Sequence, residues 1–314
     1  MTKVFIDGGA GTTGLRLAER LGLRPDIQLL SVPEEVRKDP AARAEAMRAA
    51  DVVFLCLPDA AAVEAVSLVQ GDRTVVIDTS TAHRVAPGWC YGMPELPGMR
   101  ERISAAKRIA NPGCHASGFI ALVAPLVAAG LVSADARLSC FSLTGYSGGG
   151  KKMIGEYEAP DRPGLLQGPR QYGLTQSHKH LPEMAAMTGL AHPPVFCPIV
   201  APYYAGMEVT VPLTPAETAA GPEEIRDLYR ACYADGLIRF AEAPDESGFL
   251  SASAFAGRDD MEVSVFGTPE RMLLVARFDN LGKGASGAAI QNMNLALNLK
   301  EETGLVLGDP AGQH

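Results

Sequence analysis

The sequence predicts an α/β chain in which a doubly wound parallel sheet is followed by an α+β domain with a mostly antiparallel sheet. Three patterns predict this fold class. Short apolar strands alternate with helices in the first half, as a parallel sheet requires. The first strand runs into a glycine-rich turn. In the second half, strands follow one another with fewer helices between them, and residues 268–271 form a hairpin-length loop.

The glycine-rich turn, residues 8–14, lies between the first strand, 4–7, and a helical segment, 15–21. Gly11 lets the backbone approach a pyrophosphate, Gly14 lets helix pack on strand, and the helix N-terminus favours an anion. A plain connecting turn is the alternative. We expect a Rossmann-like nucleotide site that is lined by Gly8, Gly11, Thr12, Thr13 and Gly14.

The second strand, 27–32, ends without the acidic residue that would bind a ribose 2′-hydroxyl group. Ser31 stands near that place, and Arg37 and Lys38 follow. This pattern favours a 2′-phosphate, and therefore NADP(H) over NAD. A solvated basic pair on an exposed loop is the alternative interpretation.

Two further buried strands, 51–57 and 74–78, should end at the same edge of the parallel sheet, where ligands bind. Leu57, Pro58 and Ser80 fall on that edge and are expected to contact the cofactor. Arg84 follows, and its guanidinium group can clamp an anionic group of the substrate, although a surface arginine is an equal alternative.

Cys114 is the predicted nucleophile. Asn111 suits a helix N-cap, Pro112 a first helical position and Gly130 a helix stop. Cys114 would then lie in the first turn, where the helix dipole stabilises a thiolate. The other five cysteines lie in apolar runs or lack a helix start, and are predicted to be structural. They are Cys56, Cys90, Cys140, Cys197 and Cys232.

Two polar segments follow. In extended backbone, His178 and His180 point to the same side, and Glu183 is close enough to orient one of them. A general base, a metal site and structural histidines are the competing interpretations, and no further ligand motif supports a metal. Residues 146–152 are predicted to be a flexible, donor-rich loop, either a phosphate site or a plain connection.

The second domain is expected to begin near Cys114, with strands at 137–143, 207–213, 261–267 and 272–278. A final amphipathic helix is predicted at 288–300. The net charge of −8 and the lack of a basic block argue against nucleic acid or an anionic membrane as partner. The cysteine spacing suggests neither disulfides nor a zinc site, and residues 3–6 already form a strand. We therefore expect no leader peptide and a cytoplasmic location.

Five elements, in one order along nearly the whole chain, resemble the N-acetyl-γ-glutamyl-phosphate reductase family, most of all its shorter bacterial form. They are residues 8–14, 80–84, 111–114, 178–183 and 282–287. The N-P-G-C element at 111–114 is the most specific. Two departures concern substrate contacts. His115-Ala116-Ser117 replaces the Tyr-Pro-Thr of longer members, and 146–152 differs from their Ser/Gly/Arg loop.

The resemblance implies a split NADP-binding domain, 1–113 with 285–314, and a domain for catalysis and oligomerisation, 114–284. It implies NADPH-dependent reduction of N-acetyl-γ-glutamyl phosphate to N-acetylglutamate 5-semialdehyde and inorganic phosphate, in arginine biosynthesis. A Cys114 thiolate would form a thioester that accepts hydride. A homodimer or homotetramer is expected, since such assemblies are common among soluble enzymes.

The resemblance also implies roles for individual residues. His178 is the first choice for acid/base catalysis and His180 the second, with Glu183 orienting the pair. Asn280, Gly284 and Ser286 would contact the cofactor. The expected substrate contacts are Arg84, Asn111, Tyr172, Ser147, Gly148 and Gly149.

The sequence leaves three alternative functions open. Aspartate-semialdehyde dehydrogenase shares the fold and cysteine chemistry, but typically has Asn where Gly113 stands and lacks the paired histidines. A thiol hydrolase or acyltransferase would use Cys114 and His178 without a nucleotide, which the glycine turn argues against. A non-enzymatic nucleotide sensor is the third, because a fold alone does not prove activity.

Overall fold

The computed structural model describes residues 1–308, which form two compact units. The first comprises Met1–Pro112 and Ala285–Leu305, and the second Gly113–Gly284 with residues 306–308. The predicted domain limits differ at Gly113 and Val306. Val306 belongs with the second unit because its N–H and C=O both bond to Asp259, each at 2.7 Å. Residues 309–314 of the predicted range lie outside the described part.

The first unit is built on a six-stranded, wholly parallel sheet with strand order β2-β1-β3-β4-β6-β5. Its strands are β1 (Thr2–Asp7), β2 (Ile27–Leu30), β3 (Val52–Leu55), β4 (Val75–Asp78), β5 (Cys90–Tyr91) and β6 (Arg108–Ala110). Its helices are α1 (Thr12–Gly22), α2 (Pro40–Ala49), α3 (Asp59–Leu68), α4 (Met99–Ala105) and α9 (Gly287–Ala296).

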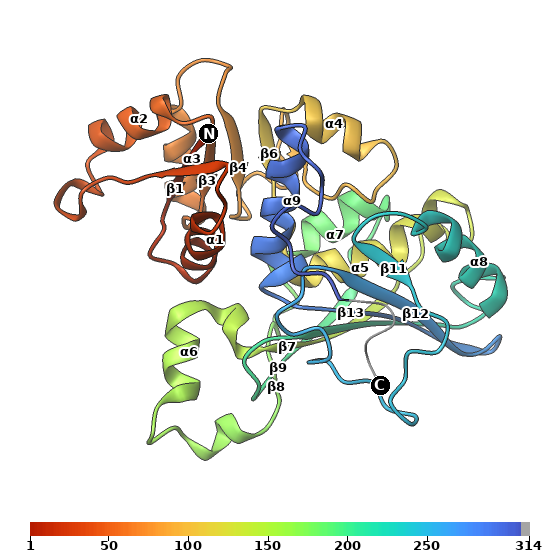
Figure 1. Ribbon diagram of the computed structural model, residues 1–314. Helices are drawn as coiled ribbons and strands as arrows, with labels where there is room; N and C mark the ends of the chain where they lie inside the picture. Colours follow the sequence, from red (N-terminus) through yellow and green to blue (C-terminus); the bar gives the residue numbers. More distant parts are fainter. Residues whose placement is uncertain (309–314) are drawn as a thin grey trace. The chain divides into compact units, whose positions relative to one another are not determined.

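Helices cover both faces of this sheet, with α1 on one side and α2 and α3 on the other (Figure 1). Phe5, Val53 and Met47 form the centre of the core under α2 and α3. Residues from the end of the chain complete the unit, since α9 packs on β4 and α4 (Figure 1). The first half of the predicted fold class, a doubly wound parallel sheet, is confirmed.

The second unit contains a seven-stranded mixed sheet with strand order β11-β12-β13-β10-β7-β9-β8. Its strands are β7 (Ser139–Gly145), β8 (Arg170–Gln171), β9 (Val195–Ala201), β10 (Met207–Leu213), β11 (Ile238–Phe240), β12 (Met261–Thr268) and β13 (Arg271–Phe278). Its helices are α5 (Cys114–Ala128), α6 (Gly150–Glu158), α7 (Leu181–Thr188) and α8 (Pro222–Cys232). The β11–β12 and β7–β9 pairs are parallel and the other four are antiparallel, so the predicted α+β domain is confirmed.

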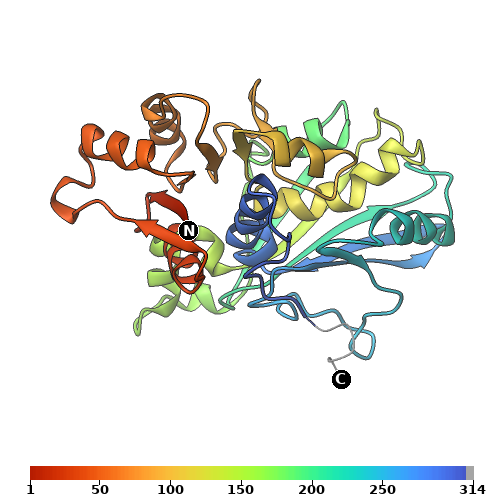
Figure 2. The ribbon, with the colours of Figure 1, turned by 45° about the horizontal axis from the view of Figure 1, so that its top comes forward.

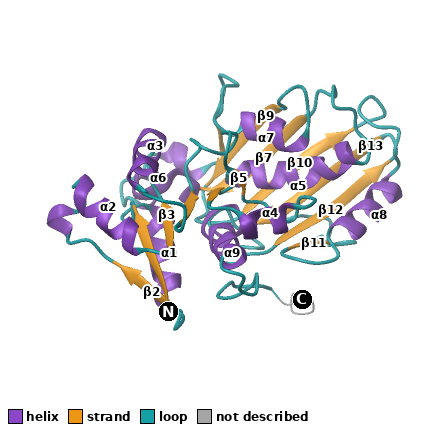
Figure 3. Cartoon of the chain, turned by 90° about the horizontal axis from the view of Figure 1, so that it is seen from above, coloured by secondary structure: helices purple, strands orange, loops and turns teal. Residues whose placement is uncertain are grey.

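Helices α5, α7 and α8 lie over one face of this sheet (Figures 2 and 3). Residues 115–124 of α5 are all buried, as expected for a helix that is apolar on every side. Gly118 lets α5 approach the sheet closely, because a Cβ there would lie 2.6 Å from Val209 of β10. None of the helices within residues 1–308 has the length and apolar character needed to cross a membrane.

Candidate active site

Cys114 is the first residue of α5. Gly113 is the N-cap, in extended conformation with φ −78° and ψ 146°. The prediction that Asn111 caps this helix is wrong, because the Asn111 side chain is used elsewhere. It donates to the carbonyl of Ala285 at 3.0 Å and accepts from the amide of Asn292 at 3.1 Å. Cys114 nevertheless lies in the first turn, where the helix dipole favours a thiolate.

Glu183, in the first turn of α7, holds the start of α5. Its Oε2 accepts the backbone N–H of Gly113 at 3.2 Å, and its side chain is buried. We predicted that Glu183 orients the histidine pair, whereas this bond goes to the residue before the nucleophile. A carboxylate at a helix N-terminus satisfies a donor that the helix leaves open. Glu183 therefore fixes the turn that presents Cys114.

Three imidazole rings gather in the second unit. The ring centroids of His178 and His180 lie 4.7 Å apart, and His115 lies 5.8 Å from the first and 5.6 Å from the second. Phe196 of β9 packs edge-on against His115 and His178. The structure thus brings the two predicted histidines together and adds a third.

The backbone around these histidines is a turn and not the extended segment we predicted. His180 has helical angles, φ −86° and ψ −13°, because it is the N-cap of α7. Its backbone N–H donates to Nδ1 of His178 at 3.2 Å. A neutral imidazole that accepts at Nδ1 carries its proton on Nε2. His178 is therefore set up as an Nε2–H donor in its neutral form.

His115 is a further polar member of this cluster, with no role predicted from the sequence. Its Nδ1 lies 2.6 Å from Oγ of Ser142 and its Nε2 lies 2.6 Å from the phenol oxygen of Tyr172. Burial lowers the pKa of His115 to about 3, and the charge of nearby His178 lowers it further in the same direction. The signal in the sequence is its position, a polar residue beside the nucleophile in an otherwise apolar helix.

Tyr172 lies beside this cluster, with its ring centroid 6.0 Å from that of His115 and 5.9 Å from that of His178. Its contact with substrate remains a prediction. Burial raises the pKa of Tyr172, and the negative charge of Cys114 adds to the increase. The phenol therefore keeps its proton at neutral pH. Its backbone N–H is anchored on the carbonyl of Pro198 at 3.0 Å.

Gly284 lies against the nucleophile in the second unit. A Cβ at Gly284 would lie 2.9 Å from the Cβ of Cys114 and 3.1 Å from the carbonyl of Asp279. Only glycine fits this approach. Its predicted contact with the cofactor remains a prediction, as does that of Ser286, which ends the same π-helical segment, Gly282–Ser286, and is buried.

The glycine-rich turn of the first unit has the form of an anion cradle. Gly8 has φ +83°, and a Cβ there would lie 2.3 Å from the carbonyl of Cys56. A Cβ on Gly14 would lie 2.7 Å from the carbonyl of Gly8. Gly11 caps α1 without a side-chain hydrogen bond, which leaves N–H groups of the first turn, at Thr12 and Thr13, for a ligand.

Thr12 supplies a specific reason to place a ligand in this cradle. Its hydroxyl is buried and has no hydrogen-bond partner among residues 1–308. A buried polar group without a partner costs free energy, and a phosphate oxygen would remove that cost. The residues present therefore fit the pyrophosphate of a dinucleotide.

The other predicted cofactor residues follow strands of the same sheet. Ser31 comes directly after β2 and is exposed, while Arg37 pairs with Glu34 at 2.9 Å. Leu57 and Pro58 follow β3, and Pro58 caps α3. These residues share the edge of the parallel sheet that also carries the glycine-rich turn.

Ser80 and Arg84, after β4, are buried and bonded within the first unit. Ser80 Oγ donates to the carboxylate of Asp78 at 2.7 Å. Arg84 donates to the carbonyls of Asn111 and Thr79, at 3.0 Å and 3.3 Å. The surface-arginine alternative is thus wrong, and these bonds tie the end of β4 to the end of β6. A substrate contact by Arg84 remains a prediction.

Comparison with known proteins identifies the family. Residues 28–106 match the semialdehyde dehydrogenase NAD binding domain, and residues 114–280 match the semialdehyde dehydrogenase dimerisation domain. N-acetyl-gamma-glutamyl-phosphate reductase of Chelativorans sp. is 47% identical over 94% of this chain and 98% of its own. N-acetyl-gamma-glutamyl-phosphate reductase 2 of Nostoc sp. is 44% identical over 96% and 99%. This chain belongs to the N-acetyl-γ-glutamyl-phosphate reductase family of semialdehyde dehydrogenases.

Solved structures show the same fold. Aspartate semialdehyde dehydrogenase II of Vibrio cholerae, complexed with ASA, superposes with a TM-score of 0.68 at 16% identity, over 95% of this chain and 98% of its own. Aspartate semialdehyde dehydrogenase of Candida albicans, with NADP, gives 0.64 at 16% identity, over 94% and 98%. These structures show the fold alone. The matched NAD binding domain and the reductase relatives show an oxidoreductase with a nicotinamide cofactor, and the resemblance seen in the sequence is confirmed.

In this family member the segment 146–152 is not the flexible loop we predicted. Tyr146–Gly149 forms a 3-10 turn that leads into α6. Ser147 is buried and accepts from the amide of Asn280 at 3.0 Å, while Asn280 accepts the N–H of Gly206 at 2.9 Å. These bonds lock the turn against the strand ends. The predicted ligand contacts of Ser147, Gly148, Gly149 and Asn280 remain predictions.

Three other cysteines of this family member have surroundings that disfavour a thiolate. Burial raises the pKa of Cys56 to about 12, and it also raises the pKa of Cys90 and Cys140. Thiols with raised pKa values are poor nucleophiles at neutral pH. The preference for Cys114 is consistent with these environments.

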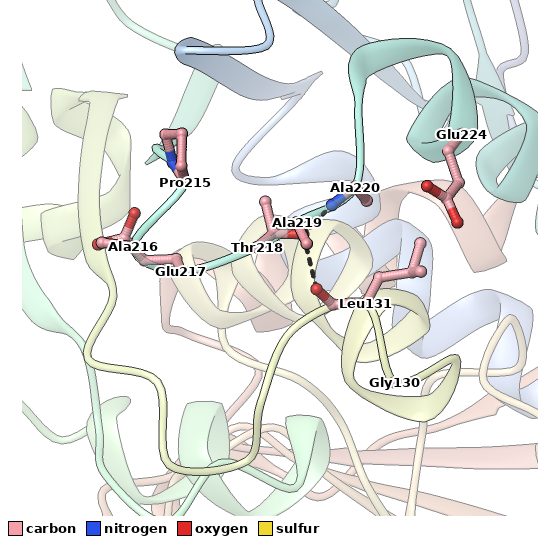
Figure 4. A pocket seen from close by; sticks show the side chains of 9 residues that line it. All are labelled: Gly130, Leu131, Pro215, Ala216, Glu217, Thr218, Ala219, Ala220 and Glu224. Atoms are coloured by element: carbon pink, nitrogen blue, oxygen red, sulfur yellow. Dashed lines mark hydrogen bonds between the residues drawn. The ribbon is translucent and has the colours of Figure 1, made fainter.

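A surface hollow of about 340 Å³ begins just after the C-terminal end of α5, the end opposite Cys114. Figure 4 shows the residues that line it. It is lined by Gly130, Leu131, Pro215, Ala216, Glu217, Thr218, Ala219, Ala220 and Glu224. Thr218 donates its hydroxyl to the carbonyl of Leu131 at 2.6 Å, which closes one wall. The 15 residues of α5 extend ~22 Å, so the hollow is separate from the nucleophile. Within residues 1–308, no three His, Cys, Asp or Glu side chains are grouped as metal ligands.

Proposed function

We propose that this reductase converts N-acetyl-γ-glutamyl phosphate and NADPH into N-acetylglutamate 5-semialdehyde, inorganic phosphate and NADP, as a step of arginine biosynthesis. One observation carries the proposal. Cys114 occupies the first turn of α5 in a chain whose relatives of that name are 44–47% identical over nearly their full length.

The acyl transfer begins with the Cys114 thiolate. Its sulfur bonds to the acyl carbon of the substrate, the carbon–oxygen bond to phosphate breaks, and inorganic phosphate leaves with the electron pair. The product is a thioester on Cys114. The start of α5 supports the negative charge on sulfur before attack.

Reduction of the thioester requires a hydride donor and a proton donor. A nicotinamide cofactor, when bound, supplies hydride to the thioester carbon. His178, which presents Nε2–H, stabilises the resulting oxyanion and protonates it. The thiohemiacetal then returns its proton and expels the Cys114 thiolate to release the aldehyde. We assign acid/base catalysis to His178 first, because His178 is partly exposed whereas His180 is buried.

NADP(H) is the proposed cofactor. β2 ends at Leu30 and is followed by the hydroxyl of Ser31 and not by a carboxylate. Within residues 1–308, exposed Arg37 pairs with exposed Glu34 alone, across one helical turn, and it can turn to a 2′-phosphate at little cost. The replacement Arg37→Ala should raise KM for NADPH several-fold while KM for NADH stays unchanged.

The second unit is also the proposed oligomerisation unit, as the matching dimerisation-domain model suggests. One face of its sheet carries α5, α7 and α8, whereas the other exposes Phe141, Val195 and Leu273, at 43%, 57% and 45%. Exposed apolar side chains gathered on one surface indicate an interface. We propose that a second copy of the chain covers this face, as a homodimer or half of a homotetramer. None of the six cysteines is paired in a disulfide, and on this basis we propose a cytoplasmic location.

The reverse assay tests the proposed reaction. N-acetylglutamate 5-semialdehyde, NADP and phosphate should yield reduced nicotinamide, followed by its absorbance, and omission of phosphate should stop steady turnover. Aspartate semialdehyde serves as the matched substrate, and turnover with it alone would overturn the substrate assignment. Hydrolysis of a thioester without nucleotide would instead indicate a thiol hydrolase.

A further inference from the structure

His115, the histidine next to the nucleophile, is buried among polar and aromatic side chains. Ser142 and Tyr172 bond to its two nitrogens, and the rings of His178, His180 and Phe196 surround it. It is neutral in the folded protein because burial lowers its pKa to about 3. A neutral imidazole donates at one nitrogen and accepts at the other. The question is which nitrogen holds the proton.

The hydrogen bond with Ser142 determines which tautomer His115 adopts. The Ser142 side chain is fully buried in β7, and Nδ1 of His115 is its sole side-chain partner among residues 1–308. If Nδ1 carried the proton, the Ser142 hydroxyl would accept and its own proton would remain buried without an acceptor. An unsatisfied buried donor costs ~1–3 kcal/mol. Ser142 therefore donates to Nδ1, and the His115 proton lies on Nε2.

The tautomer of His115 also determines the direction in which the Tyr172 hydroxyl donates. Because Nε2–H of His115 donates to the phenol oxygen, the phenol proton of Tyr172 points elsewhere. The structure shows no second hydrogen bond of the Tyr172 hydroxyl within residues 1–308, and Tyr172 is close enough to Cys114 to sense its charge. The oxygen of an acyl group bonded to the Cys114 sulfur is an acceptor of the required kind.

We infer that Ser142 and His115 are positioning residues that direct the Tyr172 hydroxyl toward the substrate oxygen, where Tyr172 acts as a catalytic hydrogen-bond donor. This inference rests on the proposed function for the identity of the acyl group. No proton is transferred along the chain of three residues. The Ser142–His115 pair sets only the direction in which Tyr172 donates, and the donor acts on the oxyanions of both acyl transfer and reduction.

The first test reads the tautomer without any activity. The protein has six histidines, so ¹⁵N-histidine labelling gives a spectrum in which His115 is assigned by comparison with His115→Gln. We expect a protonated Nε2 and an unprotonated Nδ1, unchanged between pH 5 and 9. Protonated Nδ1, or titration in this range, would overturn the inference whether or not the proposed reaction is correct.

The second test is a double-mutant cycle on the reductase reaction. Tyr172→Phe should lower kcat by about a hundredfold, the usual effect of removing one oxyanion donor, with KM changed much less. Ser142→Ala should lower kcat severalfold in the wild type and have no further effect in Tyr172→Phe. Independent effects of the two replacements would mean that Ser142 acts on packing alone and would overturn the inference.

A matched control distinguishes loss of the directed Tyr172 hydrogen bond from loss of the folded structure. Ser142→Thr keeps the hydroxyl, so we expect it to retain most of the activity that Ser142→Ala loses, provided that both variants melt near the wild type. Ser139→Ala, on the same strand but on the opposite face of the sheet, should leave kcat unchanged. A decrease in kcat for Ser139→Ala equal to that for Ser142→Ala would also contradict the inference.

Discussion

At the residue scale, two neighbours in the chain have opposite environments. Cys114 opens α5 and is partly exposed, whereas His115 points into the unit and bonds to Ser142 and Tyr172. The helix N-terminus favours an anion at the first position, and burial excludes a cation at the second. One step along the chain thus separates a group that must ionise from a group that must stay neutral.

The neutrality of His115 predicts how stability depends on pH. Its pKa is about 3 in the folded protein and about 6.5 in the unfolded chain, so between these values the unfolded chain binds the extra proton. The free energy of unfolding therefore falls as pH is lowered below about 6.5, by about 1.4 kcal/mol per pH unit from this group. Urea unfolding of the wild type and His115→Asn should show a steeper loss in the wild type between pH 6.5 and 4.5. Equal slopes would contradict a buried neutral His115.

At the scale of elements, close approaches of backbone depend on single glycines. Gly14 brings α1 onto the glycine-rich turn, Gly118 brings α5 onto β10, and Gly284 brings the segment after β13 against Cys114. At each place a Cβ would meet another atom within 3.0 Å. Close backbone packing therefore determines the form of the glycine-rich turn in the first unit and the surroundings of Cys114 in the second.

Gly14 allows a matched test within one helix. Gly14→Ala places a methyl group 2.7 Å from the carbonyl of Gly8, so the turn must shift and NADPH binding should weaken by tenfold or more. Gly22→Ala, in the last turn of α1, meets only a flexible Leu29 methyl group at 3.8 Å and should bind as the wild type does. Fluorescence titration with NADPH measures both. Equal affinities of the two variants for NADPH would contradict the assignment of the glycine-rich turn as the cofactor site.

Sequence patterns predicted some elements closely and missed others for physical reasons. The alternation of Met207–Leu213 predicted β10 because every second residue faces the helices. Strand β9, Val195–Ala201, was missed because Pro194 and Pro198 are typical of loops, and its partner β7 lies far away in the sequence. The helix start at Cys114 was predicted within three residues. The true cap depends on what Asn111 bonds to, which is a tertiary contact.

At the scale of the whole molecule, chemistry is divided between two units. The first carries the cradle at the edge of a parallel sheet, and the second carries Cys114, the histidine rings and Tyr172. Nothing local in the sequence predicts the cluster around His115, because its members come from α5, β7, β9 and the segment before α7. The paired histidines and the cysteine motif were recognisable, but their partners were not.

Positive charges on the exposed face of the second sheet should prevent the proposed oligomer from forming. Phe141→Lys combined with Leu273→Lys places two ammonium groups on the proposed interface and should convert the oligomer to monomers. Light scattering coupled to size exclusion measures the mass. Val63→Lys, on an equally exposed valine of α3, is the control and should keep the oligomer. A monomeric wild type, or an unchanged oligomer in the double variant, would contradict this interface.

The thioester on Cys114 is tested most directly by mass spectrometry of the enzyme after mixing with N-acetylglutamate 5-semialdehyde and NADP in the absence of phosphate. Acid quenching should reveal one N-acetylglutamyl group on the peptide that contains Cys114, formed together with an equal amount of reduced nicotinamide. Phosphate should remove the group, and Cys114→Ala should never acquire it. Formation of reduced nicotinamide without an adduct, or an adduct on another cysteine, would contradict the assignment of Cys114 as the nucleophile.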